Sequence, residues 1–280
     1  MTKDYYMRFP GGKAKALTFS YDDGMEQDVR LRAIFDNNGL KATFNLNSGL
    51  FSPEGTTWPQ GHIFRRMTER QILDTFGDGH HEIGLHGMTH PHLEQLPPVR
   101  VTYEIMEDRR RLEDLFKTFV RGGAYPYGTL SSMVTDCLRA CGIAYFRTTE
   151  SSYTFDVPED WIRLSPTCHH GDAALPQLCD RFLHETVEHR PYMLYIWGHS
   201  YEFERDGSWE LMEALAKRLG GHEEIYYATN IELYDYVTAF HALRISCSGQ
   251  LMENPSAMDV WYAVEGNIGC IRSGERIWIQ

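Results

Sequence analysis

The amino-acid sequence predicts an α/β protein built on an irregular (β/α)7-8 barrel, and three observations lead to this expectation. Strand-like apolar runs alternate with amphipathic helical runs over most of the 280 residues, which is typical of a parallel sheet or barrel. Polar and titratable residues follow the predicted strands, where parallel α/β barrels carry their chemistry. Beyond residue 242 the alternation stops, and short runs of period two take its place.

Eight segments have the composition of strands. The gap between the fifth and the sixth holds only a loop, 150–160, so an irregular barrel fits better than a perfect eightfold one. The predicted strands lie near residues 14–20, 41–46, 81–85, 119–124, 143–148, 161–166, 192–198 and 224–229.

Helical patterns fall between most of these strands, and several have clear end signals. Thr68 and Gln71 resemble a capping box, and Pro98 suits the first turn of a long helix. The predicted helices cover 26–38, 68–77, 98–117, 131–141, 175–189, 209–219 and 231–241.

The end of the chain has a different character. Runs at 243–248, 260–264 and 275–279 alternate apolar and polar residues, with turn residues between them, which predicts a small antiparallel sheet. We therefore expect a barrel domain over 1–241 and a small β-strand annex over 242–280, packed on the outside of the barrel.

Composition narrows the functional class. A formal net charge of −12, with no long basic run, argues against nucleic acid as a partner. The N-terminal residues contain no apolar run of signal-peptide type, and no stretch is apolar enough to span a membrane, so we expect a cytoplasmic protein without a membrane partner. The six scattered cysteines fit free thiols in a reducing compartment.

The first strand ends on two adjacent carboxylates. The apolar run from Ala16 stops at Asp22, Asp23 and Gly24. Buried carboxylates without partners are costly, so this pair should face a cavity or a cation at the end of the strand. Because successive residues of an extended segment point in opposite directions, one carboxylate can hold a metal while the other stays free as a base.

Two histidines follow the third predicted strand. His86 and His90 are four residues apart, a spacing that can chelate one cation, although such histidines also cap helices or form hydrogen bonds. Together with an acidic strand end they make three protein ligands and leave a position for water, which is the arrangement of a catalytic metal site.

These and other motifs occur in the order and approximate spacing of the polysaccharide deacetylases, the NodB-homology or carbohydrate esterase family 4. The chain resembles this family over roughly residues 10–240. The resemblance implies a NodB-like barrel and one divalent metal ion, zinc first, with cobalt, nickel or manganese as alternatives. The motifs that carry it are Thr18–Gly24, His86–His90, Tyr125–Gly128, Asp160–Trp161 and Leu194–His199.

Carried over residue by residue, the resemblance implies roles for five side chains. Asp22 resembles the catalytic base, and Asp23, His86 and His90 resemble the metal ligands. His199 resembles the catalytic acid, a task that suits a side chain titrating near neutral pH.

The sequence departs from the family pattern in one motif that matters for the base. Family members usually have Arg-Pro-Pro-Tyr-Gly where this chain has Ala124-Tyr-Pro-Tyr-Gly128, so the arginine that orients the base is missing. Arg121, three residues earlier, is a candidate to replace it.

Other polar and aromatic residues are candidates for binding substrate. The paired histidines after Cys168 either line the substrate cleft, which we favour, or form a separate zinc site with Cys168. Tryptophans at 161 and 197 either stack on a sugar face or pack in the core. The substrate-binding candidates are Tyr125, Arg121, Trp161, His169, His170 and Glu202.

The resulting functional hypothesis is a metal-dependent deacetylase, a hydrolase of carbon–nitrogen bonds other than peptide bonds. Its partner would be an oligosaccharide or small-molecule substrate carrying an acyl group, N-acetyl first. Two alternatives remain open: hydrolysis of a small cyclic amide on the same fold, and a barrel that binds carbohydrate without catalysis.

Overall fold

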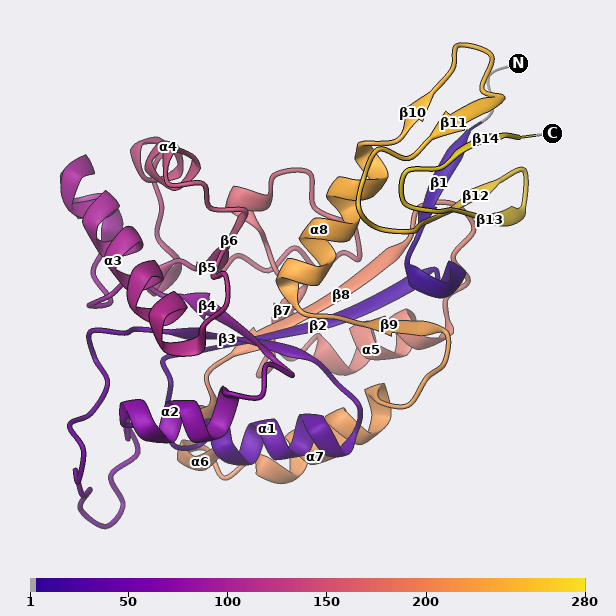
Figure 1. Ribbon diagram of the computed structural model, residues 1–280. Helices are drawn as coiled ribbons and strands as arrows, with labels where there is room; N and C mark the ends of the chain where they lie inside the picture. The colour runs from indigo at the N-terminus through magenta and orange to yellow at the C-terminus, as the bar shows by residue number, and fades with distance from the viewer. Residues whose placement is uncertain (1–3, 280) are drawn as a thin grey trace.

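A computed structural model describes residues 4–279, and its centre is a curled parallel sheet (Figure 1). The strands lie in the order β6-β5-β4-β3-β2-β8-β7, and β9 pairs with the beginning of β2. Their bounds are β2 Lys15–Asp22, β3 Ala42–Leu46, β4 Glu82–Leu85, β5 Gly122–Ala124, β6 Tyr145–Arg147, β7 Cys168–His169, β8 Tyr192–Gly198 and β9 Ile225–Tyr227.

One irregular segment links the two edges of this sheet. Leu164 forms a parallel bridge with Arg147 at one edge, and Cys168 pairs with Ile196 of β8 at the other. The sheet therefore curls into the irregular barrel that the sequence predicts. The strand predicted at 161–166 is wrong in position, because Asp160 caps a 3-10 helix, η4 (Trp161–Arg163), and the strand follows at β7.

The helices agree closely with the predicted set. The capping box at Thr68 is confirmed, since its side chain accepts from the backbone N–H of Gln71 and the Gln71 side chain accepts in return. The predicted helix 175–189 ends earlier, at His184, and α6 was not predicted. The helices are α1 Asp28–Asn37, α2 Glu69–Phe76, α3 Pro98–Phe116, α4 Ser132–Ala140, α5 Leu175–His184, α6 Ser200–Arg205, α7 Trp209–Leu219 and α8 Asn230–His241, with short 3-10 turns η1 Pro10–Gly12, η2 Leu93–Gln95 and η3 Pro126–Gly128.

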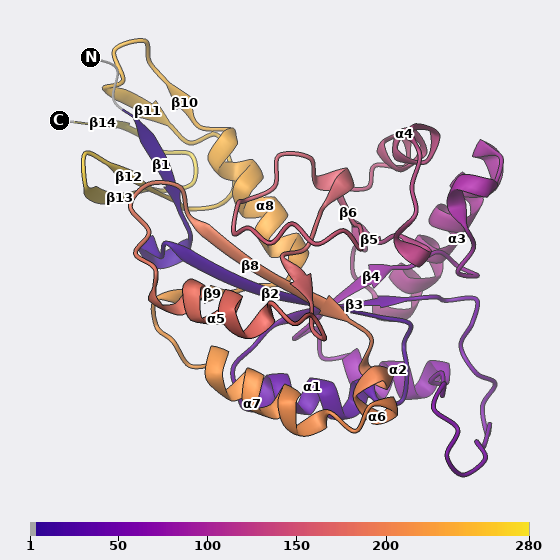
Figure 2. The same ribbon diagram turned by 180° about the vertical axis from the view of Figure 1, so that it is seen from behind.

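The side chains of β2 show that the two faces of the sheet belong to different hydrophobic cores. Leu17, Phe19 and Tyr21 belong to the main core under α1 and α7, whereas Ala16 belongs to a second core with α8. Because successive side chains point to opposite faces, Asp22 continues the inner row that begins at Ala16. Helices α1, α2 and α7 cover one face of the sheet, and α8 lies on the other (Figures 1 and 2).

The predicted antiparallel tail is present as two three-stranded sheets. One has the order β1-β12-β13 and the other β10-β11-β14. The first includes the N-terminal strand, so residues 5–8 share a sheet with the annex, and the boundary at 242 between two domains stays a prediction. The strands are β1 Tyr5–Arg8, β10 Arg244–Ile245, β11 Leu251–Glu253, β12 Val260–Val264, β13 Asn267–Ile271 and β14 Arg276–Trp278.

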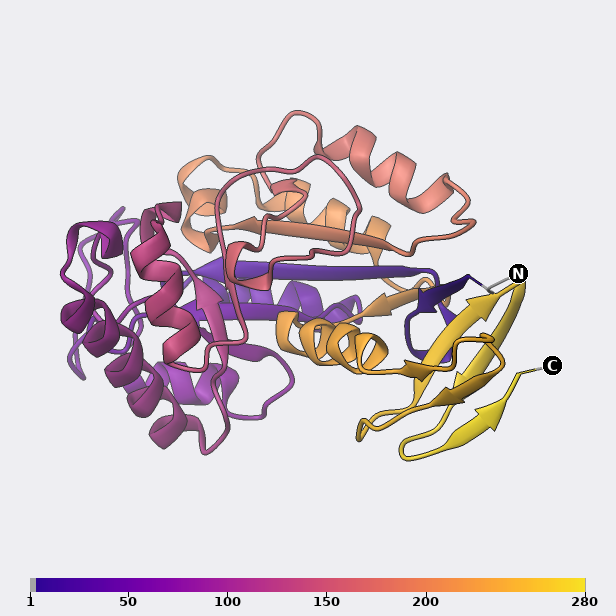
Figure 3. The ribbon, with the colours of Figure 1, turned by 90° about the horizontal axis from the view of Figure 1, so that it is seen from above.

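The annex adjoins the amino end of β2, away from the carboxyl ends of the strands (Figure 3). Tyr236 of α8 ties it to the barrel, because its hydroxyl donates to the carbonyl of Arg8 and accepts from the backbone N–H of Trp261. The annex thus supports the base of the barrel, and the strand ends at the opposite side are left for chemistry.

The thiols agree with expectation. All six cysteines are free, as predicted. Among the helices within residues 4–279, none is both long and apolar enough to cross a membrane.

Candidate metal and catalytic site

Asp22 is the innermost acidic group at the carboxyl end of β2. Its side chain is 2% exposed, and each of its oxygens has a partner. Asn45 Nδ2 donates to Oδ1 over 2.8 Å, and the guanidinium of Arg147 donates to Oδ2. His86 Nε2 lies 3.9 Å and His199 Nε2 4.0 Å from the same Oδ2, so the carboxylate faces two imidazoles across a short gap.

These neighbours keep Asp22 ionised. Burial on its own raises the pKa of a carboxyl group, but the positive charge and hydrogen bond of Arg147, with smaller effects from His86 and His199, lower the pKa of Asp22 to about 2. Asp22 is therefore a carboxylate at neutral pH and can accept a proton.

Asp23 points away from Asp22 and towards two histidines. The ligand atoms of Asp23, His86 and His90 all lie within 4.8 Å of one another. His90 Nε2 is 3.8 Å from Asp23 Oδ1 and 3.2 Å from His86 Nε2. The backbone makes this convergence possible, because Asp23 and His90 both have positive φ angles, 86° and 53°, which turn the chain sharply after each strand.

The protonation of the histidines suits metal ligation. His86 Nδ1 lies 2.8 Å from the carbonyl oxygen of Ala124, and only a protonated nitrogen can donate to that oxygen. The lone pair of His86 is therefore on Nε2, which faces the other ligands. Burial, and then the nearby His86, lower the pKa of His90 to about 4, so this imidazole is neutral at neutral pH.

Two further clusters of histidine and carboxylate have the opposite arrangement of protons. His81 Nδ1 accepts from the backbone N–H of Ala42 at 3.1 Å, and His169 Nδ1 accepts from the N–H of Gly171 at 3.1 Å. In neutral imidazoles this places the proton on Nε2, which donates to Asp36 in the first cluster and to Glu202 in the second. Both nitrogens are then committed to hydrogen bonds, and this disfavours a metal ion at either place.

The arginine beside Asp22 comes from a different strand than expected. Arg147 of β6 is fully buried, pairs with Asp22 and lies over the ring of Trp197 at 4.3 Å. The candidate Arg121 was wrong, because its guanidinium binds both oxygens of Asp235 on α8 at 3.0 and 2.9 Å, at the opposite end of β5. A charged residue inside an otherwise apolar strand was the signal in the sequence that could have identified Arg147.

His199 lies beside Asp22, with its Nε2 4.0 Å from Asp22 Oδ2. Its backbone N–H donates to Glu202 Oε2 at 3.2 Å, and its Nδ1 is 3.4 Å from the same oxygen. Burial lowers the pKa of His199, but the neighbouring Glu202 carboxylate, 3.4 Å from Nδ1, and the charges of Asp22 and Asp23 outweigh it and raise that pKa above its usual value. The surroundings of His199 thus favour its charged form, which can donate a proton.

Glu202 connects three histidines. Besides His199, it contacts His169 Nε2 at 3.0 Å and His170 Nε2 at 3.4 Å. Burial raises the pKa of Glu202, but the hydrogen bonds from His169 and His199 hold it well below its usual value. His169, His170 and Glu202, expected to line the substrate cleft, line a cavity of about 690 Å³ at α5, α6 and α7.

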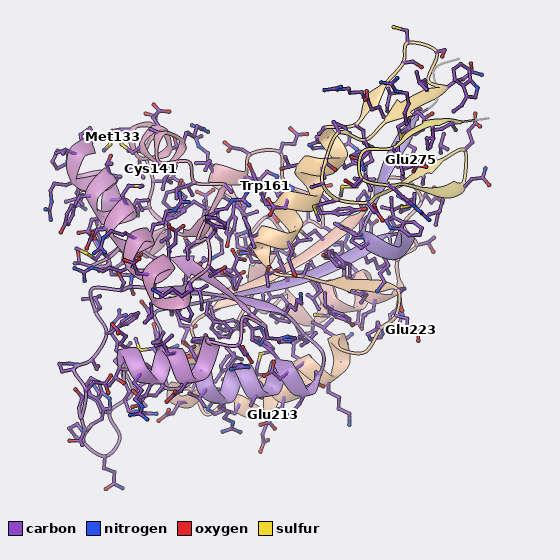
Figure 4. All side chains as sticks on the ribbon, viewed as in Figure 1. Met133, Cys141, Trp161, Glu213, Glu223 and Glu275 are labelled. Atoms are coloured by element: carbon purple, nitrogen blue, oxygen red, sulfur yellow. The ribbon has the colours of Figure 1, made fainter. Side chains whose placement is uncertain are left out.

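Two of the predicted substrate contacts are instead structural. The Tyr125 side chain is 1% exposed, and its hydroxyl donates to the carbonyl of Ile162 at 2.7 Å, so it cannot reach a substrate. Trp161 lies beside α8, where it meets Tyr234 edge to face at 5.4 Å (Figure 4). It packs, partly buried, against the second core, which favours its core-packing alternative.

A second cavity opens directly on the ligand candidates. It has a volume of about 560 Å³ and includes Asp23, His90 and Arg66 in its wall. The rest of the wall is largely apolar or aromatic, with Phe51, Trp58 and Phe64 from the loop between β3 and α2. No sequence motif marked this loop as part of the site.

The donor set of Asp23, His86 and His90 fits a divalent ion, since it offers one carboxylate, one imidazole with an assigned lone pair on Nε2 and one neutral imidazole. Fold and site together define a class: a curled parallel barrel of NodB type with two acidic residues and three histidines at its carboxyl edge. Residues 10–146 match the model of the polysaccharide deacetylase family, which confirms the expected resemblance to that family.

Solved structures agree on the fold. A Mycobacterium smegmatis protein described as a polysaccharide deacetylase is 14% identical, with a TM-score of 0.58 over 86% of this chain and 96% of that one. A carbohydrate esterase family 4 domain of a multidomain xylanase, from the hindgut metagenome of Trinervitermes trinervoides, is 15% identical, with a TM-score of 0.50 over 80% of this chain and 92% of that one.

A third structure matches over a smaller part. It is the Streptococcus pyogenes deacetylase PplD in complex with acetate, which is 21% identical, with a TM-score of 0.42. The match covers 47% of this chain and 55% of that one. No curated protein sequence matches the chain. The first two structures support the fold of this chain.

Proposed function

We propose that the protein is a metal-dependent hydrolase that removes an acyl group, N-acetyl first, from a carbohydrate-type substrate. One observation carries this proposal: the end of β2 presents one carboxylate to a pair of histidines suited to metal binding, and its neighbour to a third histidine with a raised pKa. Asp23, His86 and His90 would hold the ion, with zinc as the first candidate and cobalt, nickel or manganese as alternatives.

A divalent ion bound there would polarise the acyl carbonyl and lower the pKa of a neighbouring water molecule. Asp22, ionised and oriented by Arg147 and Asn45, would take the proton from that water as its oxygen bonds to the acyl carbon. His199 would give its Nε2 proton to the leaving nitrogen as the carbon–nitrogen bond breaks, while Glu202 holds Nδ1 on the opposite side of the ring.

The cavity of about 560 Å³ beside Asp23 and His90 is the place we propose for the substrate. Its aromatic wall of Phe51, Trp58 and Phe64 suits the apolar face of a sugar ring. A cytoplasmic location stays a prediction beside this proposal.

The experiment combines metal content with product release. The purified full chain should hold about one divalent ion and release acetate from N-acetylated sugars. Asp23→Ala should lose both properties, whereas Asp22→Asn should keep the ion and lose turnover, because it removes the base without removing a ligand. Turnover undiminished in either variant contradicts the proposal, and ring-opened products without acetate would favour the cyclic-amide alternative.

A further inference from the structure

The segment before α2 is fastened to the end of β2. Met25 and Arg66 form an antiparallel bridge, and the backbone N–H of Met67 donates to the carbonyl of Gly24 at 3.0 Å. The N–H of Glu26 donates to the carbonyl of Arg65 at 2.7 Å. This pairing brings the side chain of Arg66 against Asp23, one of the three ligand candidates.

The guanidinium of Arg66 makes contacts with both the backbone and the side chain of Asp23. Nη1 donates to the Asp23 carbonyl at 2.7 Å, and Nη2 donates to Asp23 Oδ1 at 3.2 Å. Oδ1 is also the oxygen that lies 3.8 Å from His90 Nε2. Arg66 therefore fixes the orientation of the carboxylate that faces the histidines.

Asn47 extends this contact to the second ligand-bearing loop. Arg66 Nη1 also donates to Asn47 Oδ1 at 2.9 Å. Asn47 is fully buried, and its Nδ2 donates to the carbonyls of His86 at 2.6 Å and Gly87 at 2.8 Å. A continuous set of hydrogen bonds thus runs from Asp23, through Arg66 and Asn47, to the backbone of His86.

The conformation of Asp23 explains why such support is needed. With φ at 86°, Asp23 has a backbone that side-chain-bearing residues adopt infrequently, and its carbonyl must be held in place by a donor. A planar guanidinium can serve several acceptors at once in a fixed geometry, which a lysine ammonium on a flexible stem cannot do equally well.

We propose that Arg66 and Asn47 are positioning residues that hold Asp23 and His86 at the separation one divalent ion requires; this inference rests on the function proposed above. Partners that orient metal ligands typically contribute about 10–100-fold to metal affinity, so loss of this set should cost a factor in that range.

The test measures metal affinity and does not depend on turnover. The metal-free full chain is titrated with Zn²⁺ against a chromophoric chelator, and with Co²⁺ while its visible absorption is recorded. Arg66→Met should weaken Zn²⁺ binding by about 10–100-fold and alter the Co²⁺ spectrum, and Arg66→Lys should show a smaller loss. Arg65→Met is the matched control, because Arg65 binds Glu26 and Glu204 instead of Asp23.

Asn47→Asp provides a second variant in case Arg66→Met does not fold, as judged by its thermal transition. The new carboxylate can still accept from Arg66 but cannot donate to His86 and Gly87, so Zn²⁺ affinity should fall as well. Wild-type affinity in folded Arg66→Met or Asn47→Asp, or an equal loss in Arg65→Met, overturns the positioning role while leaving the proposed function intact. A wild-type chain that binds neither ion overturns both.

Discussion

Two clusters at the edge of the sheet have almost the same composition and opposite proton arrangements. Asp23 with His86 and His90, and Glu202 with His169 and His170, each bring two imidazoles and one carboxylate within 4.8 Å. In the first, Nδ1 of His86 donates a hydrogen bond to a backbone carbonyl, and in the second, Nδ1 of His169 accepts a hydrogen bond from a backbone N–H. Proximity of ligand-type residues does not distinguish the clusters, whereas the backbone groups that contact His86 and His169 do.

The backbone group that contacts one nitrogen of a neutral imidazole decides whether the other nitrogen carries the proton. A carbonyl behind an imidazole leaves the outer nitrogen with a lone pair, and an N–H behind it leaves the outer nitrogen with a proton. The cluster of Asp36, His80 and His81 follows the second pattern, with Ala42 as the donor to His81. We therefore expect metal binding in the first cluster and hydrogen-bonded support in the other two.

The largest expected effect comes from exchanging one histidine in each cluster. His86→Gln should weaken Zn²⁺ binding by more than the roughly 100-fold that a supporting residue contributes, because it removes a ligand. His169→Gln should leave the stoichiometry at about one ion per chain. Equilibrium dialysis with metal analysis measures both quantities. A second equivalent of tightly bound Zn²⁺ that is lost in His169→Gln would show that the second cluster also binds metal.

The next effect concerns the buried pair of Arg147 and Asp22. Arg147→Met leaves a buried carboxylate without its cation, so the free energy of unfolding should fall by about 3–5 kcal/mol, and acetate release should be lost with it. Urea unfolding at neutral pH measures the first quantity. A variant as stable as wild type would show that Asp22 does not depend on this guanidinium.

Much of the fold could be predicted from the sequence because its signals are local. The apolar run of β2, the capping box at Thr68 and the end of α7 at Leu219 each depend on neighbouring residues. The strand expected at 161–166 failed for a non-local reason, since Leu164 is placed by its bridge to Arg147 and β7 by its pairing with β8.

The candidate site divides in the same way. Spacing and strand ends were enough to bring one carboxylate of the pair Asp22 and Asp23 together with His86 and His90, and the family resemblance then pointed to Asp23. Arg147 could not be assigned to Asp22 from spacing, because the two are 125 residues apart and meet only when β6 and β2 curl towards each other. Arg66 and its loop were missed for the same reason, since their contacts with Asp23 come from pairing between a loop and a strand end.

The supporting clusters make a prediction about pH and stability. Burial outweighs the charge of Asp36 and, with His80 and Arg32, lowers the pKa of His81 from 6.5 to about 4. Between these values the unfolded chain binds a proton at His81 and the folded chain does not, so stability is fully present above about pH 6.5 and falls as the pH decreases towards 4.

The expected size follows from this shift. From about pH 7.5 to about pH 5, His81 should account for about 2 kcal/mol of lost unfolding free energy. His81→Gln can still accept from Ala42 and donate to Asp36, so it should lose about that much less on acidification. Urea unfolding of both proteins at the two pH values is the measurement, and equal acid sensitivity would contradict the assigned protonation of His81.

The second cluster should act through the catalytic acid. Glu202→Gln removes the negative charge that helps to raise the pKa of His199. Because a general acid is active only when protonated, the alkaline limb of the pH–rate profile should move to lower pH in this variant. If the alkaline limb does not move in Glu202→Gln, Glu202 does not influence the pKa of His199, and the cluster has only a packing role.

The smallest expected effect concerns Arg121, the arginine that the sequence suggested as the partner of Asp22 in place of Arg147. Arg121 pairs with Asp235 at a site about one-third exposed, and exposed pairs contribute at most about 1 kcal/mol. Arg121→Ala should therefore lower the free energy of unfolding by about 1 kcal/mol or less and leave acetate release unchanged, in contrast to Arg147→Met. A loss of turnover in folded Arg121→Ala would contradict this assignment. It would mean that Arg121, and not only Arg147, is needed for the action of Asp22.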